Sequence, residues 1–296
     1  MRSMRSILTM GVVVALCGAT LASAQLLPPP PIPPPPAPSL VPIPVILTVS
    51  GNEVQGSFEL PGGFAADLTI AFENAVGLVP AALDVTVAVV NPLDPLLLGR
   101  LPGPGLAIPV GFPVLLHISP SPASALSFSG AYTISLHTHN LQLLETLPLS
   151  LFKAPDGGPF RDITRWEGRG SYRDDGSGGD FSEFLIAVDL RPIDGVIVGK
   201  FDDLQATLND NAASMSPAAV AALQANLTQA RTYYQAGDLR RAIDEMRDFS
   251  RYVKRHGGEE IPDVWRANCS PIVNVAGLLR SGADTLKFSL DRKSSH

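Results

Sequence analysis

The spacing of apolar residues changes near Gly199, and this change divides the chain into two regions of different secondary structure. From Val45 onward, short runs rich in Val, Ile, Thr and Phe are separated by Gly, Pro and Asn. After Gly199, apolar residues instead recur at intervals of three and four. Short alternating runs form strands and the longer interval forms helices, so we expect a β region followed by an α region.

The runs upstream of Gly199 predict an antiparallel β-sandwich, Ig-like or jelly-roll-like, over residues 45–195. Gly51-Asn52 lies between two runs, which favours a hairpin. Residues 91–112 contain five prolines and four glycines and instead predict a long loop. The expected strands span residues 45–50, 54–60, 66–74, 83–90, 113–119, 131–137, 148–153, 168–173 and 184–190.

Downstream of Gly199 the pattern predicts a small antiparallel four-helix bundle over residues 199–290, with a flexible tail at 291–296. Ser216-Pro217 has the residue types of an N-cap and a first helical position. Gly237 ends that helix, and Asp238 caps the next. The apolar stripes consist of Phe201, Leu204 and Leu208; Val220, Leu223, Leu227, Ala230 and Tyr234; Leu239, Ile243, Met246, Phe249 and Val253; and Ile272, Val275, Leu279 and Leu286.

The N-terminus has the parts of a cleavable signal peptide over residues 1–24. Arg2 and Arg5 give a basic start, Ile7–Leu16 is apolar, and Ala22-Ser23-Ala24 is a small-residue cleavage pattern. We therefore expect a periplasmic or secreted protein whose mature chain begins with a stiff proline-rich spacer over residues 25–44. No later segment is apolar over a length that spans a membrane.

Removal of the signal peptide would change both the charge and the cysteine content. It would leave 20 basic and 28 acidic residues, a net charge of −8, which argues against nucleic acid as a partner. It would also remove Cys17 and leave Cys269 as the single cysteine, so that no internal disulfide could hold the fold. Cys269 would then be a small buried hydrophobe or, alternatively, a reactive thiol or an intermolecular disulfide partner.

The apolar positions around the Gly237-Asp238 turn form a distinctive pattern. They are Leu223, Leu227 and Ala230 before the turn, Ala242, Ile243, Met246, Phe249 and Val253 after it, and Ala283 and Leu286 near the end. This pattern resembles the FIMAH-type helical domain of secreted bacterial proteins. The resemblance implies an accessory module appended to extracellular domains, without catalytic residues. The whole arrangement is also similar to exported bacterial proteins of unknown activity that pair a β-sandwich with such a bundle.

Two short segments carry candidate metal ligands. Strand alternation would aim His137 and His139 at one face, where they could hold a divalent ion; the alternative is polar side chains on an exposed strand. Asp174, Asp175 and Asp180 lie in a glycine-rich stretch that we interpret as a flexible loop, where they could bind calcium. The alternative there is a solvated hairpin tip, and no other cofactor is expected.

Arginines and aromatic residues interleave in the stretch that precedes these aspartates. Such side chains could form a surface that stacks on sugars or pairs with anions. The alternative is a solvated strand rim on which arginine stems cover apolar surface. The residues are Arg161, Arg165, Trp166, Arg169, Tyr172 and Arg173.

The sequence contains no nucleophile elbow, no zinc-protease helix motif and no Cys-x-x-Cys pair. We therefore expect an exported, non-catalytic binding or structural module whose partner is a macromolecule or glycan outside the cytoplasm. One alternative is a polysaccharide hydrolase with carboxylates on the sandwich, for which Glu145, Asp162, Glu167 and Glu183 are available. Another alternative is calcium-dependent adhesion through the three aspartates.

Overall fold

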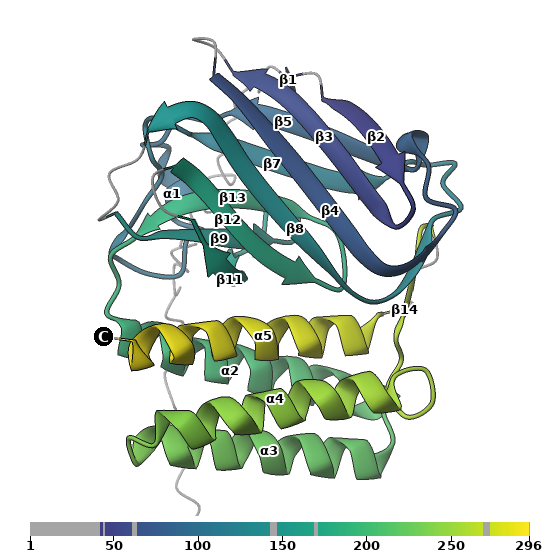
Figure 1. Ribbon diagram of the computed structural model, residues 1–296, viewed down its shortest axis with the longest axis vertical. Coiled ribbons are helices and arrows are strands. Elements are labelled where there is room, and N and C mark those ends of the chain that lie inside the picture. The colour runs from purple at the N-terminus through teal and green to yellow at the C-terminus, as the bar shows by residue number, and fades with distance from the viewer. Residues whose placement is uncertain are drawn as a thin grey trace, which may run out of the picture. The chain divides into compact units, whose positions relative to one another are not determined.

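The computed structural model describes residues 42–43, 45–60, 64–142, 147–168, 171–268 and 273–295, which all lie in one compact unit, Leu40–His296. The described chain forms two antiparallel sheets followed by four long helices (Figure 1). The predicted signal peptide, most of the predicted spacer, Arg169, Ile272 and Cys269 lie outside the described residues.

Each sheet is a ladder of antiparallel strand pairs. The first sheet has the order β1 (Pro42–Ile43), β5 (Leu83–Val89), β7 (Val114–Pro120), β13 (Glu183–Asp189), β9 (Leu149–Ala154) and β10 (Arg161–Asp162), and β6 (Leu106–Ala107) pairs with β13. The second sheet has the order β11 (Thr164–Glu167), β12 (Ser171–Gly178), β8 (Ser127–Gln142), β4 (Phe64–Val76), β3 (Glu53–Leu60) and β2 (Ile46–Ser50), and β14 (Val264–Arg266) pairs with β8.

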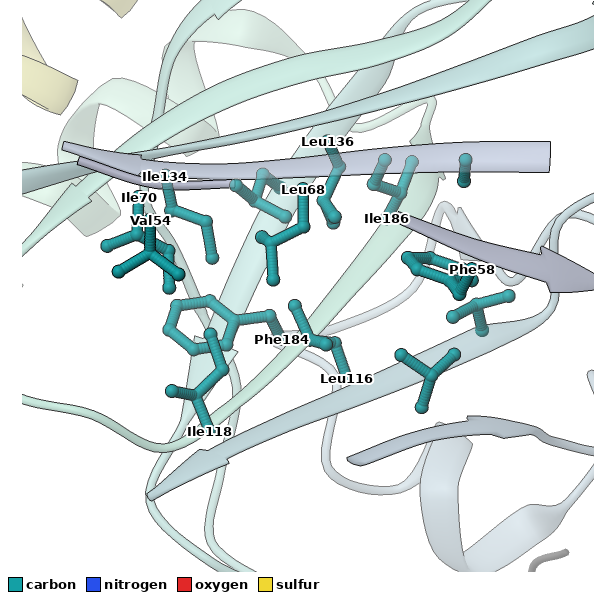
Figure 2. Close-up of a cluster of buried hydrophobic side chains, with 14 of the residues drawn as sticks. Val54, Phe58, Leu68, Ile70, Leu116, Ile118, Ile134, Leu136, Phe184 and Ile186 are labelled. Carbon is teal, nitrogen blue, oxygen red and sulfur yellow. The ribbon is translucent and has the colours of Figure 1, made fainter. Parts of the chain in front are cut away.

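Alternation along the strands builds the sandwich core. On β4 and β8, Leu68 pairs with Leu136 and Ile70 with Ile134, and all four side chains are buried. Figure 2 shows side chains of the two sheets meeting between them: Val54, Phe58, Leu68, Ile70, Ile134 and Leu136 from the second sheet, and Leu116, Ile118, Phe184 and Ile186 from the first. Full burial of each such side chain stabilises the fold by about 1.5–3 kcal/mol. The predicted antiparallel sandwich is confirmed.

Two details of the β region differ from the prediction. The expected loop over residues 91–112 contains a short helix, α1 (Pro95–Leu98), because the Asp94 carboxylate accepts a hydrogen bond from the Leu96 amide and Leu97 is buried. The strand expected over residues 168–173 instead runs as β12 to Gly178, and β11 was not expected. The carboxylate-rich and glycine-rich sequence suggested a loop, whereas pairing with β8 makes it a strand.

The α region consists of α2 (Ile193–Asn211), α3 (Pro217–Gln235), α4 (Leu239–His256) and α5 (Val275–Ser294). Ser216 and Asp238 cap α3 and α4 as predicted, each accepting a hydrogen bond of 3.1 Å from an amide in the first turn. Gly237 has a φ of +78°, which only glycine adopts readily. The four helices pack around a shared apolar cluster that includes Phe201, Leu223, Met246, Phe249 and Leu286.

The limits of the α region differ from the expected ones. Helix α2 begins at Ile193, just after Pro192, rather than at residue 199. Helix α5 continues to Ser294, so the prediction of a flexible tail from residue 291 is wrong over most of its length. Leu290 is buried, and basic residues lie in the last turn, where they suit the helix dipole. Among the described helices, none has the length and apolar character needed to cross a bilayer.

Helix α5 and β14 join the α region to the second sheet (Figure 1). Helix α5 packs on β8, β11 and β12, and β14, from the connection between α4 and α5, adds a strand beside β8. Trp265 stacks on Phe128 with ring centroids 5.2 Å apart, and Arg280 donates two hydrogen bonds of 2.6 Å to Glu73. Apolar and charged contacts therefore both hold the two regions together.

Candidate functional site

A cleft of about 360 Å³ lies where the sandwich meets α2 and α5. Its sandwich wall comes from the end of β9, from β10 and from the turn after β12, and its helical wall comes from α2 and α5. The polar lining residues are Lys153, Arg161, Asp162, Asp180, Ser182, Lys200, Asp203, Thr207, Asp210, Asn211, Ser281 and Thr285. No local sequence pattern predicts this cleft, because its walls come from segments far apart in the chain.

A buried ammonium group lies at the bottom of the cleft. Lys200, on α2, is 5% exposed, and its Nζ lies 2.9 Å from Oδ2 of Asp162 on β10. The same Nζ donates to the hydroxyls of Thr285 at 2.7 Å and Ser289 at 2.9 Å, both on α5. Burial lowers the pKa of Lys200, and the charge of Asp162 opposes that effect. The ion pair therefore connects the first sheet with two helices.

Arg191 extends this ion pair into a network. Its guanidinium lies 3.5 Å from Asp162 and donates two hydrogen bonds, of 2.8 and 2.6 Å, to Asp189 at the end of β13. Burial acts to raise the pKa of Asp189, but the hydrogen bonds and charge of Arg191 lower it below its usual value. A second hollow, of about 330 Å³, is lined by Arg191 and shares Arg161, Asp162, Lys200 and Asp203 with the cleft. The paired charges of the network therefore line both hollows.

The rim of the cleft carries further charge pairs. Lys153 donates a 2.6 Å hydrogen bond to the Asp180 carbonyl and also contacts the Asp180 carboxylate. Arg161 lies 3.9 Å from Asp203, whose pKa is raised by burial while Arg161 opposes the rise. Ser182 is buried, and its hydroxyl has no hydrogen-bond partner within the described part of the chain. A buried hydroxyl without a partner can form a hydrogen bond with a polar group of a ligand in the cleft.

The predicted arginine and aromatic surface is only partly assembled. Trp166 on β11 and Arg173 on β12 lie together, with the guanidinium carbon 5.0 Å from a ring centroid of the indole. Tyr172 is buried in the core, where it stacks on Phe112. Arg161 lies on the first sheet at the cleft. Arg165 is exposed on β11. Burial raises the pKa of Asp284 on α5, and the charge of Arg165 opposes this rise. Arg169 lies outside the described residues.

The prediction of a flexible acidic loop is wrong, because Asp174 and Asp175 lie on β12. Their side chains alternate, so they point to opposite faces of the sheet. Asp174 is fully buried, and neither of its carboxylate oxygens has a described hydrogen-bond partner. Burial raises the pKa of Asp174 well above its usual value, with Glu167 adding to the rise. Asp180 pairs with Lys153, so this arrangement does not favour a calcium site.

The carboxylates considered for catalysis are held by separate partners. Asp162 pairs with Lys200, Glu167 accepts a 3.0 Å hydrogen bond from the Leu149 amide, and Glu183 pairs with Arg100. Of these three, only Asp162 lines the cleft. Glu145 lies outside the described residues. The three described members of the predicted set therefore supply no opposed pair in the cleft.

His137 and His139 point to the same face of β8, as the alternation predicts. Asp67, on the neighbouring strand β4, pairs directly with His137 and lies beside both rings. Oδ2 of Asp67 is 2.5 Å from Nε2 of His139, and the two imidazole centroids are 4.7 Å apart. Asp67 was missed from the sequence, because only the register of β4 and β8 brings it to the histidines.

The fold defines a protein in which a β-sandwich is followed by a bundle of four helices, with a cleft between them. The chain belongs to a family of unknown function (DUF6689), whose model matches residues 12–294. The match includes the sandwich and the helices alike, so their pairing is a property of the family. No curated protein and no solved structure matches the chain.

Proposed function

We propose that this protein is a non-catalytic binding module that acts outside the cytoplasm, in the periplasm or as a secreted protein, and that its ligand occupies the cleft between sandwich and helices. The cleft is the observation that carries the proposal. Its volume of about 360 Å³ lies within the usual range for small-molecule sites. The predicted signal peptide supports the location, and the FIMAH-like helices would suit an accessory role.

The charges of the cleft favour a neutral ligand rich in hydroxyl groups, such as a short glycan. Its cations face carboxylates: Lys200 lies against Asp162, Lys153 against Asp180, and Arg161 against Asp203. An anionic ligand would have to break one of these pairs to reach a cation. A sugar hydroxyl both donates and accepts hydrogen bonds, so it can bind between paired charges without separating them.

A bulky side chain on the helical wall tests this site. Thr207, on α2, lines the cleft, so Thr207→Trp would fill part of its volume. The matched control is Thr228→Trp, which makes the same change on the exposed surface of α3. We expect wild type and Thr228→Trp to bind the same glycans on an array and in calorimetry. Thr207→Trp should weaken binding at least about tenfold, a loss of about 1.4 kcal/mol.

Two results would count against this proposal. One is the absence of binding to cell-wall polymers, glycans and short peptides at physiological salt. The other is binding that Thr207→Trp and Thr228→Trp affect equally. In the second case the ligand would lie elsewhere on the protein.

One observation favours the hydrolase alternative. The Asp203 carboxyl, which burial holds above its usual pKa, lines the same cleft as Asp180, and a raised pKa suits a general acid. If the protein is a hydrolase, bound polysaccharides release reducing ends, and Asp203→Asn abolishes the release while binding persists. Binding without release favours the non-catalytic module.

A further inference from the structure

The exposed face of the second sheet carries a cluster of three metal-type ligands, away from the cleft lining. Asp67 of β4 is directly opposite His137 of β8, and His139 follows two residues along the same strand. One ligand atom from each residue lies within 4.8 Å of the other two. The Asp67 and His139 side chains are about half exposed, so an ion has access from solvent.

The spacing of these atoms fits a small divalent ion. Zinc binds imidazole nitrogen and carboxylate oxygen at about 2.0–2.2 Å, which places tetrahedral ligands about 3.4 Å apart. Small side-chain rotations bring three atoms that already lie within 4.8 Å to that spacing. Two imidazoles and one carboxylate suit transition ions better than calcium or magnesium, which prefer oxygen ligands alone.

The surrounding charges also bear on binding. Arg173 of β12 is directly opposite His137 and repels a cation, whereas Asp67 attracts one. Arg173 would also attract an anionic group to an open position on a bound ion.

An ordinary ion pair explains only part of this cluster. Asp67 and His139 alone would form a surface pair, of the kind that His117 forms with Asp156 on the first sheet. That pairing leaves unexplained a second imidazole, which lies edge-on beside the first with its ligand atom in the same group. We infer that Asp67, His137 and His139 bind a zinc-type divalent transition ion on the outer face of the second sheet.

Zinc titration of the untagged mature chain, stripped with chelator, tests the inference. Calorimetry should show one site, zinc should raise the melting temperature, and cobalt should give the visible absorption of a low-coordinate ion. Each of Asp67→Asn, His137→Ala and His139→Ala should weaken zinc binding at least about tenfold. The matched control His117→Ala should bind as wild type does.

The inference fails if zinc neither binds nor raises the melting temperature. It also fails if the three variants bind zinc as tightly as wild type, since the ion would then occupy another site. Cys269→Ser should leave binding unchanged, and loss of binding in that variant would contradict the assignment. Calcium binding with no zinc binding would overturn it as well. The result is independent of the cleft, because Thr207→Trp should leave zinc affinity unaltered.

Discussion

The burial of Asp174 predicts how the stability of the protein depends on pH, because Asp174 is a fully buried carboxyl group without a described hydrogen-bond partner. Burial raises its pKa well above the usual value, and the negative charges of Glu167, Asp162 and Asp175 add to the rise, while Arg292 opposes it. The folded protein therefore holds a proton on Asp174 that the unfolded chain releases. Asp174→Asn supplies a neutral side chain of the same shape that does not bind or release this proton.

The sign of the effect follows from proton linkage. Between the unfolded pKa, about 3.9, and the raised folded pKa, the native state binds one more proton than the unfolded state. The stability of the wild type therefore falls as the pH rises through this interval, by about 1.4 kcal/mol per pH unit from this group alone. Asp174→Asn should match wild type near pH 4 and gain on it steadily as the pH increases.

Urea unfolding measured between pH 4 and pH 8 tests this prediction, with the fluorescence of Trp166 and Trp265, the two tryptophans of the chain, as the signal. A gain of about 1.4 kcal/mol, which this slope gives over one pH unit, should raise the melting temperature by about 3–6 °C in a domain of this size. Glu59→Gln, at an exposed carboxylate on β3 that has no ion pair among the described residues, controls for the loss of a negative charge. A stability difference that is constant with pH, or that turns against Asp174→Asn as the pH rises, would refute the reasoning.

Two further substitutions test the junction between sandwich and helices. Lys200→Met leaves the buried Asp162 carboxylate with a hydrogen bond from the Thr164 amide and with the more distant Arg191 as its nearest described cation. We therefore expect a loss of about 3–5 kcal/mol in urea unfolding, partly recovered in the double variant with Asp162→Leu. Trp265→Ala removes the contacts of the indole with Phe128 and Phe181. We expect the free energy of unfolding, measured by thermal unfolding, to fall by about 3 kcal/mol. Full stability in either variant would contradict the role assigned to that contact.

Local patterns in the sequence predicted most of the fold correctly. The core faces of β4 and β8 follow from two-residue alternation, and the caps Ser216 and Asp238 follow from residue type at a helix start. Each of these signals lies within a few residues of the structure that it specifies. The sandwich and the helical bundle could therefore be predicted without knowledge of contacts between distant segments.

The misses share one physical cause. The sequence Asp174-Asp175-Gly176 suggests a solvated turn, and only pairing with β8 and cover from α5 make it a buried strand. Asp67 is seventy residues from His137, and the register of two strands, which the sequence does not reveal, brings them together. Lys200 was not among the predicted site residues, because its partner Asp162 belongs to the other region. Charged groups at long-range contacts were the residues that local patterns could not place.

Under the proposed function, the position of the cleft would couple ligand binding to the contact between sandwich and helices. One wall is formed by β10 and the turn after β12, and the other by α2 and α5, so a ligand in the cleft contacts both regions. Any ligand that binds only when the two walls are in place stabilises their contact by its own binding free energy. The reverse also holds. A variant such as Lys200→Met, which weakens the contact between the two walls, should lower the affinity for the ligand even where the ligand does not touch Lys200. A helical region that served only as an appended spacer would show no such coupling.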